Sequence, residues 1–295
     1  MLSLAFLGLG AIGLPIARRL ASSFPLAVWN RTRSKALELQ ASDPVRVAQS
    51  PADCARNADI VFTCLSTSAD VEALLDGEDG LLAGLKSGAV LIDCTSGDPA
   101  ASRRIAAGLA ASGVAFLDAP VSGGVTGARE GKLTVMCGGD ERVLDRVRPV
   151  LGAFASKVIH CGPTGAGDAV KAANQALLAI HIWSTGEALA ALSKAGVSAS
   201  VALDVINASS GRSNSSQNLF PERVLGRKFP RTFRLALLDK DVGIAAGFAR
   251  ENAVPSPMIE LAAALFRDAH ASLGEEADHV EAVKLIEQRA GVEIS

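Results

Sequence analysis

The chain contains no tyrosine among its 295 residues, and aromatic residues of every kind make up only 4%. No mechanism that uses a phenol as the proton donor, such as the Tyr/Lys pair of short-chain dehydrogenases, can therefore operate in this chain. Histidine is also scarce, and the four that occur show neither an H-x-x-x-H nor an H-E spacing: His160, His181, His270 and His279. We therefore expect no metal site.

An excess of charge of either sign is missing too. The 29 lysines and arginines against 31 aspartates and glutamates leave a formal net charge of −2. This balance argues against nucleic acid and membrane surfaces as partners, because each requires a basic face. No apolar run reaches the length of a membrane span. A hydrophobic share of 49% indicates a globular protein, and the length favours two domains.

The five cysteines are odd in number, form no C-x-x-C pair and lie beside or within apolar runs. This usage is typical of buried free thiols in a reducing compartment. The apolar N-terminal segment has no basic residue before it and is interrupted by glycines, which argues against a signal peptide. We therefore expect a cytoplasmic protein.

Up to residue 162, short apolar runs alternate with helical stretches, which predicts β-α units around a mostly parallel sheet. The predicted strands are Leu2–Leu7, Leu26–Trp29, Val45–Val47, Ile60–Cys64, Val90–Asp93, Ala115–Asp118, Leu133–Cys137 and Lys157–His160. After the glycine-rich turn 161–167, an Ala/Leu-rich stretch over about 166–195 predicts one long helix, and helical spacing continues to about residue 290. We expect a doubly wound, Rossmann-type α/β domain over 1–162. An all-α domain over 163–295 follows, joined to it by the long helix.

A glycine fingerprint follows the first predicted strand and opens a helix. It comprises Gly8, Leu9, Gly10, Ala11, Ile12 and Gly13, in the pattern G-x-G-x-x-G. In this context Gly8 permits a tight turn, Gly10 lets the backbone approach a pyrophosphate, and Gly13 lets helix and strand pack closely. The alternative is a tight strand-to-helix turn without a ligand. We predict that the loop binds a dinucleotide at the positive end of the helix.

The end of the second predicted strand lacks the carboxylate that usually accepts hydrogen bonds from the ribose of NAD. Asn30, Arg31 and Thr32 stand there instead, and no acid occurs before Glu38. A guanidinium with two neutral polar side chains matches a 2′-phosphate, so we predict that NADP is preferred and that NAD remains possible. Alternatively, Arg31 stacks on the adenine without discriminating between the two cofactors.

Three further segments combine polar residues with small ones. Ser122, Gly123 and Gly124 would offer a hydroxyl and backbone N–H groups to a small anion. Lys171 lies one turn into the long helix, with Asn174 and Gln175 on the same face. Either the ammonium group of this lysine faces a cleft, or it reaches water at the protein surface. Lys240 stands between two aspartates at 239 and 241, where we expect a second apolar helix to begin, and by itself this cluster is typical of a solvated surface.

Taken together these motifs resemble one family. The segments F-L-G-L-G-A-I-G at 6–13, D-A-P-V-S-G-G at 118–124, G-A-G-D-A-V-K-A-A-N-Q at 165–175 and K-D-V-G at 240–243 occur in the order and spacing of the β-hydroxyacid dehydrogenases. That family includes 3-hydroxyisobutyrate dehydrogenase, tartronate semialdehyde reductase, glyoxylate/succinic semialdehyde reductase and, more distantly, 6-phosphogluconate dehydrogenase. The resemblance covers essentially the whole chain.

The resemblance implies a role for each motif. Lys171 would be the catalytic acid/base, with Asn174 or Gln175 orienting the substrate. Ser122, Gly123 and Gly124 would hold the substrate carboxylate, and Lys240 would lie near substrate or cofactor. Further cofactor contacts are implied at Leu65, Ser66, Thr67, Thr95 and Ser96. The helical domain would also form a homodimer or homotetramer.

The implied activity is the NAD(P)-dependent interconversion of a 3-hydroxy acid, such as 3-hydroxyisobutyrate, and its semialdehyde. The alternatives are a reductase of tartronate semialdehyde, succinic semialdehyde or glyoxylate, and a dinucleotide-binding module without turnover. Imine reductases share the architecture but typically replace the lysine, so Lys171 argues against them. Side chains that set specificity are expected from 125–129 and 209–214, where Arg212 either meets a second anionic group or caps a helix.

Overall fold

The computed structural model describes residues 2–294, and the chain folds into two compact units, Met1–Lys171 and Ala172–Ser295. The division falls inside the longest helix, α9 (Ala166–Lys194). Each unit has its own hydrophobic core.

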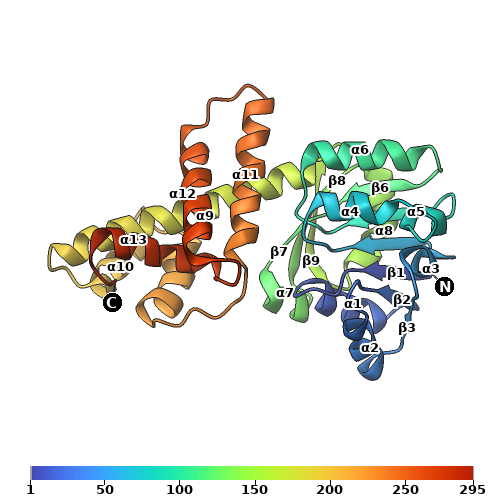
Figure 1. Ribbon diagram of the computed structural model, residues 1–295, viewed down its shortest axis with the longest axis horizontal. Coiled ribbons are helices and arrows are strands. Elements are labelled where there is room, and N and C mark those ends of the chain that lie inside the picture. Colours follow the sequence, from blue (N-terminus) through green and yellow to red (C-terminus); the bar gives the residue numbers. More distant parts are fainter. Residues whose placement is uncertain (1, 295) are drawn as a thin grey trace. The chain divides into compact units, whose positions relative to one another are not determined.

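The first unit is built on one sheet in the order β3-β2-β1-β4-β5-β6-β8-β7, with β9 paired to β8 (Figure 1). Its strands are β1 (Leu4–Leu7), β2 (Leu26–Trp29), β3 (Val45–Val47), β4 (Ile60–Thr63), β5 (Val90–Asp93), β6 (Ala115–Asp118), β7 (Val121–Ser122), β8 (Leu133–Gly138) and β9 (Ala155–Gly162). Strands β1 to β6 are parallel, whereas β8 runs antiparallel to β6 and β7. The strand order reverses between β1 and β4, where open α/β sheets bind their ligands.

Helices cover both faces of this sheet and give it two separate apolar layers. The helices of the first unit are α1 (Gly13–Ala21), α2 (Arg33–Ser42), α3 (Pro51–Ala55), α4 (Ser68–Leu75), α5 (Leu81–Gly84), α6 (Pro99–Ala110), α7 (Gly124–Glu130) and α8 (Glu141–Leu151). Helices α1, α2, α7 and α8 pack on one face, and α3 to α6 pack on the other. Central strands such as β1 and β4 are buried along their whole length, which accounts for their continuous apolar runs.

The predicted fold class is therefore confirmed for this unit. The one strand that the sequence analysis missed is β7, whose two residues are too short to show an apolar pattern. Every strand that it predicted is present, with ends that differ by up to two residues.

The second unit is all-helical, as predicted. Besides most of α9, it contains α10 (Ala199–Asn207), a π-helix (Ser215–Leu225), α11 (Leu235–Glu251), α12 (Pro257–Leu273), a 3-10 turn (His279–Glu281) and α13 (Ala282–Ala290). Helices α11 and α12 run side by side (Figure 1). The charge cluster at 239–241 lies within α11, one turn after its start, and does not open the helix as the sequence analysis expected.

The expectation that no segment could span a membrane needs a correction, because α9 is long and apolar enough to do so by length and composition. Its buried residues, among them Ala176, Ile182 and Trp183, form part of the second unit's core. A core helix of this kind meets the same length and hydropathy criteria as a membrane span.

Candidate active site

The glycine loop joins β1 to α1 at the position where the strand order reverses. Gly8 has a φ of +104°, and a Cβ there would lie 2.3 Å from the carbonyl oxygen of Cys64. A Cβ on Gly13 would lie 2.0 Å from the carbonyl oxygen of Gly8. At Gly10, by contrast, no atom lies within 4 Å of the Cβ position. The loop is therefore closed on the protein side and open at Gly10, which fits the approach of a pyrophosphate to the backbone.

The side chain of Asn30 ties the second loop to the first. Its Oδ1 accepts a hydrogen bond of 2.8 Å from the Leu9 backbone N–H, and its Nδ2 donates to the Thr32 carbonyl at 2.9 Å. The amide group is thus used within the protein, whereas we had predicted that it faces a 2′-phosphate. Arg31 and Thr32 are exposed beside it.

The loops that follow β4 and β5 are cross-linked by buried polar groups. Asp93 accepts hydrogen bonds from the Thr63 hydroxyl at 2.8 Å and from the Thr95 backbone N–H at 3.0 Å. The Thr95 hydroxyl in turn accepts from the Leu65 backbone N–H at 2.9 Å. Burial raises the pKa of Asp93 to about 6. Thr95 is only 1% exposed, and its hydrogen bonds hold the two loops together from inside the protein.

Other predicted cofactor residues in these loops differ in their surroundings. Thr67 is the N-cap of α4, where its hydroxyl accepts from the Asp70 N–H at 3.1 Å. Ser66 is exposed, and Ser96 is half-buried. The exposed Ser66 can therefore contact a ligand, whereas the Thr67 hydroxyl caps α4.

The predicted carboxylate site forms the turn from β7 into α7. Ser122 ends the edge strand, and the turn then requires positive φ values of +128° at Gly123 and +63° at Gly124. Both glycines are exposed, and a Cβ on Gly124 would meet no atom within 4 Å. This turn can present backbone N–H groups and a hydroxyl to a small anion.

Lys171 lies on the second turn of α9 and is 8% exposed. Asn174 follows it by one turn and is exposed. Gln175 is buried, and its Nε2 donates a 3.0 Å hydrogen bond to Asp241 of α11. Lys240 forms an ion pair of 3.0 Å with the same aspartate. Of the two amides, Gln175 is therefore bonded to α11, whereas Asn174 is exposed and its Nδ2 donates a 3.3 Å hydrogen bond to the Gln175 Oε1.

Two buried carboxyls that meet at the start of α9 were not predicted as functional residues. Asp118, at the end of β6, and Asp168, in the first turn of α9, are 0% and 1% exposed. Burial is the main cause that raises the pKa of both, that of Asp168 to about 8. The signal available in the sequence was an acidic residue placed where an apolar segment meets a glycine turn.

None of the five cysteines, all of which the structure describes, has the lowered pKa of an activated nucleophile. All five are free, and burial raises the pKa of Cys54, Cys64 and Cys137 to about 12. Thiols of this kind stay protonated at neutral pH. Within residues 2–294, no group of three or more histidine, cysteine or acidic side chains has the arrangement of a metal site.

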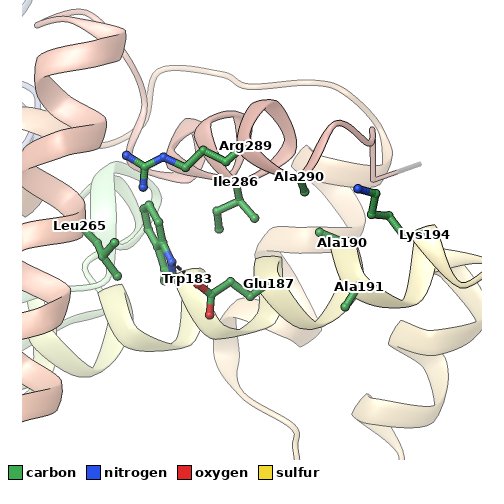
Figure 2. Close-up of a pocket in the computed structure, with 9 residues that line it drawn as sticks. All are labelled: Trp183, Glu187, Ala190, Ala191, Lys194, Leu265, Ile286, Arg289 and Ala290. Atoms are coloured by element: carbon green, nitrogen blue, oxygen red, sulfur yellow. Dashed lines mark hydrogen bonds between the residues drawn. The ribbon is translucent and has the colours of Figure 1, made fainter.

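A cavity of about 400 Å³ lies in the second unit and contains none of the predicted site residues (Figure 2). Helices α9, α12 and α13 line it, and the Trp183 indole donates a 2.8 Å hydrogen bond to Glu187 at its wall. The residues that line it are Trp183, Glu187, Ala190, Ala191, Lys194, Leu265, Ile286, Arg289 and Ala290. The predicted chemistry therefore does not belong to this cavity.

Comparison with known proteins assigns both parts of the chain to the same kind of protein. Residues 3–162 match the NAD binding domain of 6-phosphogluconate dehydrogenase, and residues 165–286 match the family described as NAD-binding of NADP-dependent 3-hydroxyisobutyrate dehydrogenase. The chain belongs to the β-hydroxyacid dehydrogenase family. This confirms the resemblance drawn from the four motifs.

Individual relatives match over nearly the whole chain. The 2-(hydroxymethyl)glutarate dehydrogenase of Eubacterium barkeri is 35% identical over 100% of this chain and 98% of its own length. An NAD-dependent L-serine dehydrogenase of Pseudomonas aeruginosa is 35% identical over 90% of this chain and 92% of its own. The solved 3-hydroxyisobutyrate dehydrogenase of Mycobacterium tuberculosis with L-serine has a TM-score of 0.89 and 31% identity, covering 97% of this chain and 99% of that one.

The family membership establishes the general chemistry. The protein is a nicotinamide-dinucleotide-dependent oxidoreductase that acts on the hydroxyl group of hydroxyacids. The open backbone at Gly10, with the N-terminus of α1 behind it, fits the pyrophosphate of such a cofactor.

Proposed function

We propose that the protein interconverts a small 3-hydroxy acid, such as 3-hydroxyisobutyrate, and its semialdehyde, with Lys171 as the acid/base. The observation that carries this proposal is the pair Lys171 and Asn174, one turn apart on α9, in a chain of a hydroxyacid dehydrogenase family. A lysine can remove the proton of a hydroxyl group and return it to an alkoxide.

The substrate class follows from what the relatives act on or bind. 3-Hydroxyisobutyrate, L-serine and 2-(hydroxymethyl)glutarate occur in the names of relatives and of a solved structure, and each has a CH₂OH group next to the carbon that bears the carboxylate. They differ in the other substituent on that carbon. We therefore propose a 2-substituted 3-hydroxypropionate as the substrate. Tartronate semialdehyde, succinic semialdehyde and glyoxylate are the alternatives.

Each of the site residues has a separate role in the proposed reaction. The Ser122 hydroxyl and the N–H groups of Gly123 and Gly124 bind the carboxylate and so orient the substrate. Asn174 holds the hydroxyl group toward the side-chain amine of Lys171, because Gln175 is bonded to Asp241. Lys171 in its neutral form then accepts the hydroxyl proton. When bound, the oxidised dinucleotide would supply the acceptor for the hydride that leaves the carbon bonded to this oxygen.

NADP is the proposed cofactor, with NAD as the alternative. Arg31 and Thr32 are exposed after the end of β2, and the sequence has no acid before Glu38 to accept hydrogen bonds from the ribose hydroxyls of NAD. The match of the second part to an NADP-dependent family supports this preference, whereas the NAD-dependent L-serine dehydrogenase stands against it.

Replacing Arg31 with alanine is expected to raise the KM for NADP⁺ by roughly tenfold or more, because one charge-assisted contact to a phosphate is lost. The KM for NAD⁺ should change less than twofold. Arg33→Ala is the matched control, since Arg33 is also exposed but bonds to Gln49. Initial rates with both cofactors measure the effect. Equal changes for NADP⁺ and NAD⁺ in Arg31→Ala would show that the guanidinium only stacks on the adenine.

The test of the overall function is a rate panel that follows reduced nicotinamide. The substrates are L- and D-3-hydroxyisobutyrate, L-serine, glycerate, threonate, 2-(hydroxymethyl)glutarate and 4-hydroxybutyrate, each with NADP⁺ and NAD⁺. We expect the highest kcat/KM with a 2-substituted 3-hydroxypropionate and NADP⁺. Turnover with 4-hydroxybutyrate alone contradicts the proposed substrate class, and binding of cofactor without any turnover favours the non-catalytic alternative.

We also propose a cytoplasmic homodimer or homotetramer. Several large apolar side chains of the second unit are exposed, namely Leu177, Val201, Val205, Met258 and Leu261. Exposed apolar side chains in this number are typical of a surface that another copy covers. Light scattering of the purified protein measures the assembly, and a monomeric mass contradicts it.

A further inference from the structure

Two buried aspartates connect the start of α9 to the loops at the carboxyl end of the sheet. The first is Asp168, whose Oδ1 accepts a hydrogen bond of 2.9 Å from the Gly97 backbone N–H. Its Oδ2 lies 2.6 Å from the Ser102 hydroxyl of α6. Both partners belong to the segment that follows β5, and Gly97 directly succeeds the predicted cofactor residues Thr95 and Ser96. Asp168 therefore joins the loop 95–98, which we call the cofactor loop, to α9, the helix that carries Lys171.

The second aspartate holds the same helix from the sheet. Asp118 ends β6, and its Oδ1 accepts from the Gly165 N–H at 2.7 Å while its Oδ2 accepts from the Asp168 N–H at 3.0 Å. The carboxyl satisfies N–H groups that the first turn of α9 leaves without partners, as a capping residue does. A Cβ on Gly138 would lie 2.5 Å from Oδ1, so the neighbouring strand β8 is shaped to admit this side chain.

The far side of the cofactor loop is fixed as well. The Asp98 N–H donates a 2.8 Å hydrogen bond to the Ser68 hydroxyl, and the Asp98 side chain caps α6 through the Ala100 N–H at 2.7 Å. The loop 95–98 is thus held between α4 on one side and Asp168 on the other. Any displacement of Asp168 moves the loop and the first turns of α9 together.

We propose that Asp168 is a positioning residue, with Asp118 as its support, which fixes the Lys171 ammonium relative to the cofactor loop at 95–98. The proposal rests on the proposed role of Lys171. Its physical reason is geometric, because Lys171 lies one turn beyond Asp168 on the same rigid helix. Misplacement of a reacting group by about 1 Å can lower a rate by roughly two orders of magnitude.

The protonation state of Asp168 provides a second test of the proposal, through the pH dependence of stability. Burial, followed by the neighbouring charge of Asp118, raises its pKa to about 8, so the carboxyl is mostly protonated at pH 7. The charged neighbours that raise this pKa are Asp118 on β6 and Asp93 on β5. Arg103 of α6 lies near Gly165, and Lys171 lies one turn further along α9. The thiols of Cys137 and Cys161 lie near Asp118, and that of Cys94 lies near Asp93. The thiols have raised pKa values and stay neutral over the range that matters.

The experiment compares Asp168→Ala with Asp168→Asn in the full-length enzyme. The alanine removes both bonds, so we expect kcat to fall tenfold or more and the Kd for NADPH, measured by calorimetry, to rise at least threefold. The asparagine keeps an oxygen for the Gly97 N–H and offers an amide to Ser102. It should bring both quantities back to within about threefold of the parent at pH 7. Should the alanine variant fail to fold, Ser102→Ala, which removes one of the two bonds, is expected to give a smaller change in the same direction.

Asp59→Ala is the matched control for a loss of stability alone. Asp59 also accepts from a backbone N–H, that of Ser3 at 2.8 Å, and from a side chain, that of Lys86 at 2.7 Å. It precedes β4 and therefore lies at the amino end of the sheet, opposite the loops of the site. We expect it to lower the melting temperature without changing kcat or the Kd for NADPH.

The melting temperature of the cofactor-free protein supplies a readout that does not depend on activity. Because the pKa of Asp168 is raised on folding from an ordinary value of 3.8 to about 8, its contribution to stability is lost as the pH rises from about 4 to about 8. In Asp168→Asn this loss is absent. The melting temperature of the variant minus that of the parent should therefore be more positive at pH 8.5 than at pH 5.

The outcomes separate the positioning role from the proposed function. An Asp168→Ala enzyme with parental kcat and parental NADPH affinity overturns the positioning role, and so does an Asp168→Asn enzyme that is as impaired as the alanine variant. A difference in melting temperature that does not depend on pH also overturns it. If Lys171→Ala keeps ordinary turnover, the proposed function fails instead, and the NADPH affinities of the Asp168 variants still test the link to the cofactor loop.

Discussion

Replacement of Lys171 with alanine is expected to lower kcat by roughly two to four orders of magnitude, which is the range that general acid/base catalysis contributes. The loss is large because the hydroxyl proton must leave as the carbon gives up its hydride. The Kd for NADPH should stay within about twofold of the parent. Single-turnover rates with 3-hydroxyisobutyrate and NADP⁺ measure the chemical step directly.

Two variants sharpen this experiment. Lys171→Arg keeps the positive charge but cannot release a proton at neutral pH, so it should be nearly as slow as the alanine variant. Lys194→Ala removes an exposed lysine from the last turn of the same helix and should leave kcat unchanged. Added methylamine should restore part of the rate in Lys171→Ala, in proportion to the concentration of free amine. Ordinary turnover in Lys171→Ala, or full activity in Lys171→Arg, contradicts the assignment.

Replacement of Gly13 with alanine is expected to lower the stability of the first unit by about 3 kcal/mol, at the upper end of the cost of overpacking. The new Cβ would lie 2.0 Å from the Gly8 carbonyl oxygen, a backbone atom that cannot rotate away. For a unit of this size the melting temperature should fall by roughly 6 to 12 °C. Cofactor affinity should fall as well, because Gly8 belongs to the loop that faces the pyrophosphate.

Gly10→Ala is the informative partner of this variant. No atom lies within 4 Å of its Cβ position, so the fold should keep its melting temperature to within about 2 °C. The methyl group would occupy the space that we assign to the pyrophosphate, and the Kd for NADPH should rise at least tenfold. Gly108→Ala, on the exposed side of α6, should change neither affinity nor turnover and should raise stability slightly. Parental NADPH affinity in Gly10→Ala would rule out this loop as the dinucleotide site.

The alternation of apolar runs and helical stretches was enough to predict the fold, because the central strands are buried on both faces. Strands such as β1 and β4 then appear as uninterrupted apolar segments. The pattern was insufficient where a strand has two residues, as in β7, and where a helix begins without a side-chain cap, as in α11. In both places tertiary contacts, not the local sequence, set the boundary.

The site was predictable to the extent that a motif marks a backbone shape. Gly8 and Gly13 have the close approaches that the fingerprint implied. Side-chain partners were not predictable, because they depend on residues far apart in the chain. Asn30 bonds to Leu9 across 21 positions, and Asp168 bonds to Ser102 across 66. Periodicity contains no information about such pairs, and therefore the polar network at the start of α9 went unrecognised.

The lack of tyrosine and the positions of the two tryptophans make this protein a convenient optical sample. Trp29 ends β2, where its carbonyl accepts from the Gly8 N–H at 3.0 Å, and Trp183 belongs to the core of the helical unit. Ultraviolet emission then comes from one indole in each unit, with no phenol signal beneath it. Trp29→Phe and Trp183→Phe would each leave a single reporter. The fluorescence of each variant would then follow the unfolding of one unit. Energy transfer from Trp29 to reduced nicotinamide would report the binding of cofactor near the carboxyl end of β2.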